Sequence, residues 1–420
     1  MSENRLEVLE KSEAYASYQA NLAFEKELNI LRNDFYYQMI DSKKTSLVDF
    51  LYKPLDTLSG DAYSARRIDE HRTFYLLVDG MGKGVSASFT TVIITSFINH
   101  LVDKMIEHDS FSLDILIRES MDFIRPVLLD DEVLAIDYIC FDSYYAVLEY
   151  AKFAMPPFLL HNKEDDIIKI KSNNTPMSKW QTSYNINRYD ISNIEKFLFY
   201  SDGVVENSIK EPSSIYGKYI ENDFRESFTR EEFKEKFLDR IADQEDDLTL
   251  IFINSLEMNE ETLLSKNSFG TSLDDLSKAE EWYERLWQDF NVDMKCVYKA
   301  GVVFSELFMN AYEHGNLGID SKTKHRYLED DVYFEKLSEA ERLCDKKIFI
   351  EVYKVEELSS EYIITKICDE GEGFDTQILS QIFRNSRKFN GRGVFVSRKN
   401  SMGIYYNTKG NCVLFLNKIS

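Results

Sequence analysis

Short apolar runs recur through the middle of the chain, and several are rich in β-branched and aromatic residues. Such runs predict strands, which lie at 73–78, 144–150, 167–170, 196–200 and 248–253. Between them, apolar residues spaced three or four positions apart predict helices, at 85–102, 113–127 and 230–242. The mixture predicts one α+β domain over residues 41–256.

A second block of the same kind follows a polar joint at 257–261. The same patterns predict helices at 273–290 and 299–313, and strands at 347–354, 362–368, 403–407 and 412–417. A charged segment, 320–346, interrupts this block, and we expect it to form additional helix. The sequence therefore predicts a second α+β domain over residues 257–420.

The first 40 residues differ from both blocks, because they contain neither Gly nor Pro and are rich in Glu, Lys, Leu and Ala. Phe24, Leu28, Leu31 and Phe35 follow one another at steps of 4, 3 and 4, which is the spacing of one apolar helix face. Two interpretations stay open. The region is either a regulatory helix or short coiled coil that joins two copies of the chain, or a helix that packs on its own domain.

One uncharged stretch, 84–102, raises the question of a membrane span because of its length. It carries Ser, Thr, Asn or His at eight positions, and its apolar residues recur at steps of three and four. That pattern is typical of a helix with one face in a soluble core. We therefore expect a core helix here and no membrane segment.

Composition narrows the classes of function. The 420 residues include 50 Lys plus Arg and 73 Asp plus Glu, which gives a formal net charge of −23. Such a surface repels phosphate backbones and anionic lipid, so we expect no nucleic-acid or membrane partner. The N-terminus lacks an apolar signal core, and the five cysteines are scattered without CxxC spacing. These features predict reduced thiols in a cytoplasmic protein.

Four acidic sites stand at or near the ends of apolar runs, next to Gly, Ser or a second Asp: Asp61, Asp79, Asp202 and Asp246. Three of them adjoin the predicted strands 73–78, 196–200 and 248–253. If these strands end at one place, the carboxylates converge, and their mutual repulsion needs compensation. Carboxylate oxygens suit Mg²⁺ or Mn²⁺, and a pair of such ions activates water and holds a phosphoryl group. A lone Asp-Gly pair is usually only a turn, so the hypothesis depends on the whole set.

The motifs around these aspartates resemble the PP2C-type phosphatases of the bacterial SpoIIE and RsbU group, over most of residues 41–255. They read Leu58-Ser59-Gly60-Asp61, Val78-Asp79-Gly80-Met81-Gly82-Lys83-Gly84, Tyr200-Ser201-Asp202-Gly203-Val204-Val205-Glu206 and Asp246-Asp247-Leu248-Thr249. The resemblance implies a β-sandwich flanked by helices, with a dinuclear Mn²⁺ or Mg²⁺ site. It also implies that the helix near 31–40 is a regulatory switch.

The same resemblance assigns roles to individual residues. Asp79 would bridge both ions, and Gly80 would contribute its carbonyl oxygen. Asp202 and Asp246 would be further ligands, and Asp61 would lie close by, bound directly or through water. Metal-bound water would hydrolyse phosphoserine or phosphothreonine on a protein.

The second block carries a different set of residues. Glu306 and Asn310 are four positions apart and therefore share one face of a predicted helix, which ends in Glu313-His314-Gly315-Asn316. Two glycine-rich turns follow, Asp369-Glu370-Gly371-Glu372-Gly373-Phe374 and Gly391-Arg392-Gly393. An Asn carbonyl can complete a Mg²⁺ shell beside phosphates, and a carboxylate on the same face can orient a nucleophile.

This set resembles the GHKL ATPases, in particular the anti-sigma-factor serine kinases, over about 263–418. The resemblance implies an α/β sandwich that binds ATP under a mobile lid. Asn310 would bind Mg²⁺, Glu306 would act as base or position water, and Asp369 would hydrogen-bond adenine. The pocket and lid would be shaped by Gly371, Gly373, Gly391 and Gly393.

Together the two resemblances predict a cytoplasmic signalling protein. Its phosphatase would dephosphorylate a small anti-sigma antagonist of the STAS type, and its ATP-binding domain would phosphorylate it, so the chain would control a sigma factor by partner switching. The alternative is a non-catalytic ATP-binding module that captures a sigma factor or antagonist, with the phosphatase fold as a regulatory scaffold. The N-terminal helix would allow a homodimer.

Overall fold

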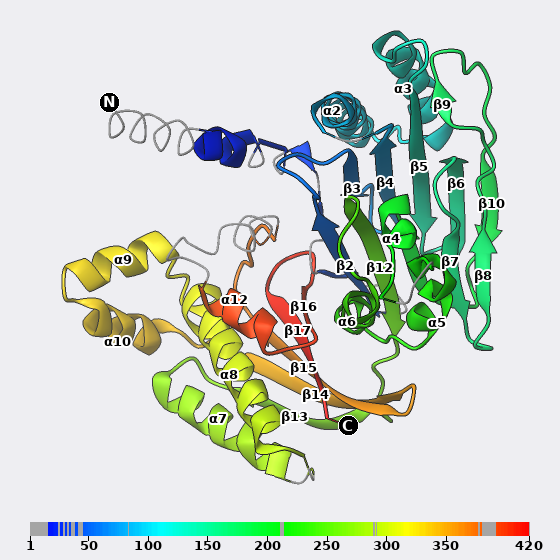
Figure 1. Ribbon diagram of the computed structural model, residues 1–420. Helices are drawn as coiled ribbons and strands as arrows, with labels where there is room; N and C mark the ends of the chain where they lie inside the picture. The colour runs from blue at the N-terminus through cyan, green and yellow to red at the C-terminus, as the bar shows by residue number, and fades with distance from the viewer. Residues whose placement is uncertain are drawn as a thin grey trace, which may run out of the picture. The chain divides into compact units, whose positions relative to one another are not determined.

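The computed structural model describes residues 16–419, apart from 24–25, 28–29, 32, 35–37, 41–44, 83, 211–213, 289, 291, 377–378 and 380–391. The chain divides into two compact units (Figure 1). Unit 1 comprises Met1–Asp34, Phe50–Arg225 and Lys236–Phe252. Unit 2 comprises Phe35–Asp49, Glu226–Glu235 and Ile253–Ser420. Three short segments of the first predicted block, 41–49, 226–235 and 253–256, are grouped in unit 2.

Unit 1 contains a sheet of five antiparallel strands in the order β10-β6-β5-β4-β3, with the short strand β9 beside β5. The strands are β3 (Asp61–Arg67), β4 (Arg72–Gly80), β5 (Val133–Asp142), β6 (Val147–Phe153), β9 (Met177–Ser178) and β10 (Asn187–Asp190). The strands predicted at 73–78 and 144–150 are β4 and β6, although 143–146 is a turn.

A second set of strands has the order β12-β11-β7-β8, with β2 next to β12. It belongs to unit 1 except for 45–49 of β2 and 253–256 of β12, which are grouped in unit 2. The bounds are β2 (Thr45–Lys53), β7 (Phe158–Asn162), β8 (Ile167–Ile170), β11 (Ile194–Tyr200) and β12 (Leu248–Leu256). Aromatic pairs join the two sets face to face. The ring centroids of Tyr75 and Phe199 are 6.1 Å apart, and those of Phe141 and Phe197 are 5.2 Å apart. The aromatic interior confirms the expected β-sandwich.

Helices flank the sandwich, as the resemblance implied (Figure 1). They are α2 (Val85–Glu107), α3 (Leu113–Val127), α4 (Asp202–Glu206), η1 (Tyr216–Lys218), α5 (Ile220–Arg225) and α6 (Arg230–Arg240). α2 packs on β3 and β4. In the described part of the chain, α2 is the one helix long and apolar enough to cross a membrane, and half of its most apolar window is buried inside the structure.

The N-terminal region corrects one expectation. Gln38–Ile40 form strand β1 rather than part of a helix that extends over 31–40. This strand pairs with Ser46–Val48 and with Tyr406, and backbone hydrogen bonds to neighbouring strands outweigh local helix propensity. Leu31 is buried. The other members of the proposed apolar stripe, Phe24, Leu28 and Phe35, lie outside the described residues.

Unit 2 consists of a sheet with helices on one face (Figure 1). Its strands run in the order β13 (Leu263–Phe269), β14 (Ile348–Glu357), β15 (Ser360–Asp369), β17 (Cys412–Lys418), β16 (Gly403–Tyr406) and β1. The helices are α7 (Leu273–Gln288), α8 (Met294–Asn310), the π-helical turn η2 (Ala311–Asn316), α9 (Ser321–Glu329), α10 (Tyr333–Leu343) and α12 (Arg392–Lys399). Tyr283 and Trp287 of α7 and Phe304 of α8 pack against apolar strand residues in one core. The charged segment 320–346 is helical, as expected.

Candidate active site

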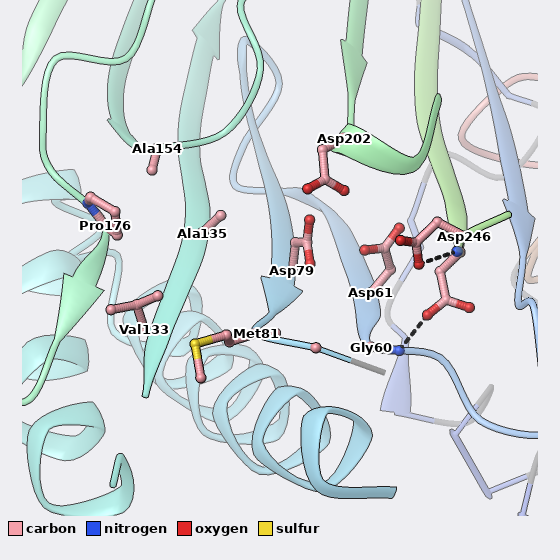
Figure 2. Close-up of a pocket in the computed structure, with 13 residues that line it drawn as sticks. Gly60, Asp61, Asp79, Met81, Val133, Ala135, Ala154, Pro176, Asp202 and Asp246 are labelled. Atoms are coloured by element: carbon pink, nitrogen blue, oxygen red, sulfur yellow. Dashed lines mark hydrogen bonds between the residues drawn. The ribbon is translucent and has the colours of Figure 1, made fainter. Parts of the chain in front are cut away.

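Four strands of unit 1 bring the predicted aspartates to one pocket. Asp61 begins β3 and is the direct cross-strand partner of Asp79, near the end of β4. Asp202 begins α4 directly after β11, and Asp246 lies two residues before β12. The carboxylates of Asp61, Asp79 and Asp202 point toward one another, with Asp246 beside them (Figure 2). All four line a cavity of about 290 Å³, which also contains Gly80. The expected convergence is therefore confirmed.

The turn at Ser201-Asp202-Gly203 positions the Asp61 carboxylate and the segment that carries Asp246. The Ser201 hydroxyl donates to Asp61 Oδ2 at 2.6 Å, and the Ser201 amide donates to the carbonyl of Thr249 at 3.0 Å. A Cβ atom on Gly203 would lie 2.0 Å from the backbone oxygen of Asp247, so only glycine permits this close approach. The turn after β11 is thereby packed directly on the segment that carries Asp246.

Asp247 holds the loop that leads to Asp61. Its Oδ2 accepts from the Gly60 amide at 2.7 Å, and its Oδ1 accepts from the Leu55 amide at 2.7 Å. Asp247 stands in the Asp246-Asp247-Leu248-Thr249 motif, but its role could not be predicted from the motif alone. Its position next to Asp246 was the available signal.

Glu27 is a second positioning residue that the sequence analysis missed. Its carboxylate accepts from the Ser59 amide at 2.9 Å, and the Ser59 hydroxyl accepts from the Asp61 amide at 3.0 Å. Only 3% of Glu27 is exposed, and burial raises its pKa to about 7, although the hydrogen bond from Ser59 opposes the shift. No local pattern in the sequence singles out this glutamate among the many in the N-terminal region.

The aspartates are crowded enough to disturb one another. Burial raises the pKa of Asp79 to about 10, with further contributions from the charges of Asp61 and Asp202. Burial also raises the pKa of Asp61 well above its ordinary value, against the hydrogen bonds from Ser201 and Thr249. The ionised forms therefore need a compensating positive charge.

The donor set fits a hard divalent cation. Carboxylate oxygens and the Gly80 carbonyl are the ligands that Mg²⁺ and Mn²⁺ prefer, and Mg²⁺ keeps several waters as ligands. Among the described residues, no group of three or more His, Cys, Asp or Glu side chains has the arrangement needed to coordinate a metal ion. The chemistry of the pocket thus suits metals, whereas the individual ligand assignments stay predictions.

In unit 2 the structure places several of the predicted nucleotide-site residues near one another. Glu306 and Asn310 lie in the last turns of α8, and Asp369 ends β15. A Cβ on Gly315 would lie 2.4 Å from the Asp369 carboxyl carbon, so the turn after α8 packs closely on that side chain. Burial raises the pKa of Tyr406, and the charges of Glu306 and Asp369 add to this shift.

The glycine-rich turns of unit 2 have different outcomes. The Gly371 amide donates to Asp369 Oδ1 at 2.8 Å, and burial raises the pKa of Asp369 to about 6. Gly373 has a φ of 78°, a left-handed conformation that favours glycine. Gly391 lies outside the described residues, and Gly393 is the second residue of α12. The region is compatible with a ligand site, but its role stays a prediction.

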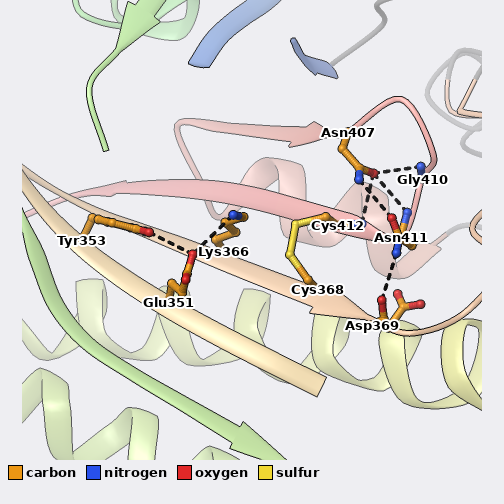
Figure 3. Close-up of a disulfide and its surroundings, with 9 residues drawn as sticks. All are labelled: Glu351, Tyr353, Lys366, Cys368, Asp369, Asn407, Gly410, Asn411 and Cys412. Atoms are coloured by element: carbon orange, nitrogen blue, oxygen red, sulfur yellow. Dashed lines mark hydrogen bonds and ion pairs between the residues drawn. A yellow bond between two sulfur atoms is a disulfide. The ribbon is translucent and has the colours of Figure 1, made fainter. Parts of the chain in front are cut away.

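A disulfide beside this region corrects the cysteine prediction. Cys368 of β15 and Cys412 of β17 are direct cross-strand partners and form a disulfide (Figure 3). The two residues are 44 positions apart, so their pairing depends on strand register, which spacing along the sequence does not reveal. Cys140, Cys296 and Cys344 are free thiols, as expected.

Part of the chain matches a known family model. Residues 69–255 match the family model described as Stage II sporulation protein E (SpoIIE). A search of curated proteins gave no match.

Solved structures resemble the chain at low identity. The RsbU and RsbW domains of Rv1364c from Mycobacterium tuberculosis are 12% identical, with 89% of this chain and 94% of that chain covered and a TM-score of 0.45. The SiaA-PP2C domain of Pseudomonas aeruginosa is 15% identical, with coverage of 58% and 98% and a TM-score of 0.47.

The PP2C phosphatase domain of SpoIIE from Bacillus subtilis is 16% identical, with coverage of 51% and 65% and a TM-score of 0.42. Because the identities and TM-scores are so low, these structures do not support the phosphatase assignment by themselves. The assignment depends on the match of residues 69–255 to the SpoIIE family model. Residues 69–255 are a PP2C-type serine/threonine phosphatase domain of the SpoIIE kind.

Proposed function

We propose that this pocket hydrolyses phosphoserine and phosphothreonine on a protein with two Mn²⁺ or Mg²⁺ ions. The observation that carries the proposal is the convergence of Asp61, Asp79, Asp202 and Asp246 on one cavity, where burial and mutual repulsion raise the pKa of Asp79. Asp79, Asp202, Asp246 and the Gly80 carbonyl oxygen would hold the ions, with Asp61 bound directly or through water. When bound, the ions supply charge stabilisation for the phosphoryl group and activate a water molecule.

The chain's own residues hold this arrangement. Ser201 orients the Asp61 carboxylate by a direct hydrogen bond, and Asp247 fixes the Gly60 amide beside it. Buried, preorganised ligands need little rearrangement when charge develops on the phosphoryl group.

Substitution of the central aspartates tests the site. Asp79→Ala and Asp202→Ala should each lower hydrolysis of p-nitrophenyl phosphate and of a phosphoserine peptide by about 1,000-fold or more, because each removes a ligand that acts on the reacting group. Asp243→Ala is the matched control, since Asp243 is an exposed aspartate on the same approach to β12. Unchanged hydrolysis in both active-site variants would refute the site assignment.

We further propose that unit 2 binds ATP with Mg²⁺ and phosphorylates a serine of a STAS-type antagonist, the protein that the phosphatase would dephosphorylate. Glu306 would be the base or position water, Asn310 would bind Mg²⁺, and Asp369 would contact adenine. The close packing of Gly315 on Asp369 and the raised pKa of the Asp369 carboxyl support a ligand site at this end of β15. The alternative is capture of a sigma factor or antagonist without phosphate transfer.

Labelled ATP distinguishes these alternatives. With Mg²⁺ and a STAS-type antagonist, the kinase proposal expects label on a serine and its loss in Asn310→Ala. A stable complex without transfer supports the binding module instead. Absence of ATP binding in the wild type would reject both. In the phosphatase direction, the expected substrate is the phosphorylated antagonist of a cytoplasmic partner-switching pathway.

A further inference from the structure

Exposed apolar side chains lie in the phosphatase pocket or on the segments that carry its lining residues Met81, Val133 and Pro176. We call them the apolar rim: Met81, Val85, Phe89, Leu129, Val133 and Trp180. Their exposed fractions run from 37% for Val133 to 77% for Val85. A single exposed hydrophobic residue needs no explanation. Six of them on neighbouring segments form an apolar patch, and such patches mark binding sites for other molecules.

The rim continues directly from the pocket. Met81 and Val133 line the same cavity as the four aspartates, and both are seen at one side of it (Figure 2). Four residues after Met81, Val85 opens the first turn of α2, and Phe89 lies one further turn along the same face. One side of the rim is therefore built by the start of α2.

Hydrogen bonds join α2 to the turn before β5. The Thr90 hydroxyl donates to Glu132 Oε1 at 2.7 Å, and the Leu129 amide donates to Glu132 Oε2 at 3.0 Å. Only 8% of Glu132 is exposed. Because this buried carboxylate ties both elements, Phe89 and Leu129 are held at a fixed separation.

The other side of the rim is fixed to the same turn. Val133 pairs with Ser178 of β9, and the Trp180 indole donates to the Asp130 carbonyl at 3.4 Å. Pro176, just before β9, also lines the pocket. The apolar surface thus extends from α2 to the β9 segment around one opening.

We propose that the apolar rim binds the hydrophobic residues that flank the phosphorylated residue of a protein substrate, an inference that rests on the phosphatase function proposed above. A phosphoserine that enters the cavity must bring its neighbours over Met81 and Val133, because these residues form its edge. The cavity itself is acidic and disfavours a phosphate without cations. Binding energy from apolar contacts outside the cavity offsets this repulsion, since it is independent of charge.

The test compares two phosphoserine peptides, one with leucines on both sides of the phosphoserine and one with serines. Binding is measured by fluorescence anisotropy with Mn²⁺ and non-hydrolysable phosphonate analogues, so that turnover is not required. The full-length wild type should bind the leucine peptide about tenfold more tightly. Phe89→Ser and Trp180→Ser should each lose most of that preference. Hydrolysis of p-nitrophenyl phosphate, which carries no flanking residues to contact Phe89 or Trp180, should stay within about twofold of wild type.

Tyr145→Ser is the matched control, because Tyr145 is 73% exposed and lies in the turn at the opposite end of β5. It should retain the preference for the leucine peptide. Equal affinity of the wild type for both peptides, or an unchanged preference in both rim variants, overturns the proposal. So does a rim variant that only dissociates a dimer, because a second copy of the chain would then be the occupant. If the wild type does not hydrolyse p-nitrophenyl phosphate, the proposed phosphatase function is wrong. The peptide-binding measurement would still decide whether the apolar rim binds hydrophobic flanking residues.

Discussion

At the scale of single residues, buried carboxyl groups dominate the chemistry of unit 1. Three neighbouring residues, Ser201, Asp247 and Glu27, hold Asp61 and the loop that leads to it in place for cations. Because each of these three binds a backbone amide or a ligand oxygen, their effect is geometric. Substitutions there should change metal affinity more than the chemistry of hydrolysis.

Glu27 predicts a pH dependence of stability. Its pKa in the folded chain is raised to about 7, above the ordinary value of 4.5, so the folded state holds this proton more tightly than the unfolded state. The free energy of unfolding should therefore fall as pH rises from about 4.5 to about 7. Glu27→Gln, which cannot ionise, should be more stable than wild type at pH 8 by about 1–3 kcal/mol and similar to it at pH 4.

Urea unfolding in EDTA at both pH values measures this difference. Glu119→Gln, at an exposed glutamate of α3, is the control and should have the same free energy of unfolding as the wild type at pH 4 and at pH 8. A constant offset between Glu27→Gln and wild type across pH would contradict the titration argument.

A buried ion pair beneath the pocket predicts a large loss of stability when one partner is removed. Lys152 Nζ lies 2.6 Å from Asp137 Oδ2, both side chains are fully buried, and the ammonium lies 3.5 Å from the centre of the Phe158 ring. Lys152→Met leaves an uncompensated buried carboxylate and should lower the free energy of unfolding by about 3–5 kcal/mol. The double variant Asp137→Leu/Lys152→Met should recover most of that loss in urea unfolding, and a double variant as unstable as the single would contradict this account.

At the scale of elements, the active site depends on how closely the turn after β11 packs on the start of β12. Gly203→Ala would place a Cβ 2.0 Å from the Asp247 carbonyl oxygen and must separate the two segments. A displacement of about 1 Å should lower kcat/KM for p-nitrophenyl phosphate by about 100-fold.

Gly301→Ala is the control, since a Cβ there meets open space inside α8. It should raise stability by about 0.5–1 kcal/mol and leave hydrolysis unchanged. Wild-type activity in Gly203→Ala would show that the turn is less constrained than the contact implies.

One buried carboxylate contacts both inserted helices, α9 and α10. Glu313, 1% exposed, accepts from Lys324 Nζ at 2.6 Å and from the Tyr333 hydroxyl at 2.9 Å. Both contacts join the insertion to the turn that follows Asn310. The insertion is therefore fixed to the element that carries the candidate nucleotide residues.

At the scale of the molecule, cations should stabilise the chain. Because the aspartates repel one another when ionised, Mn²⁺ at 100 times its dissociation constant should raise the free energy of unfolding by about 2.7 kcal/mol, and EDTA should reverse the change. Calorimetry measures the shift in the transition of unit 1. Asp79→Asn should reduce the shift strongly and be more stable than wild type in EDTA. An Asp79→Asn variant that keeps the full Mn²⁺ shift would argue against ligation by Asp79.

Much of the architecture was predictable because it depends on local patterns. The helix at 113–127 and the strand at 167–170 were predicted with the bounds that the structure shows. Residues three or four apart share a helix face, and a short apolar run is typical of a strand. The four aspartates were predictable as a set because all stand beside Gly, Ser or a second Asp, and three of them adjoin predicted strands, whose rigid ends have fixed positions.

Other features were decided only by contacts between distant parts of the chain. Strand β1, the disulfide between Cys368 and Cys412, and the roles of Glu27 and Asp247 had no local signature that identified them. The hydrogen bond from Gly60 to Asp247 joins residues 187 positions apart. Periodicity and motif spacing report which face of an element is apolar and which residues stand at its ends. Strand register, burial of a carboxylate and the partners of a buried amide arise only when the chain closes on itself, because they depend on which elements become neighbours.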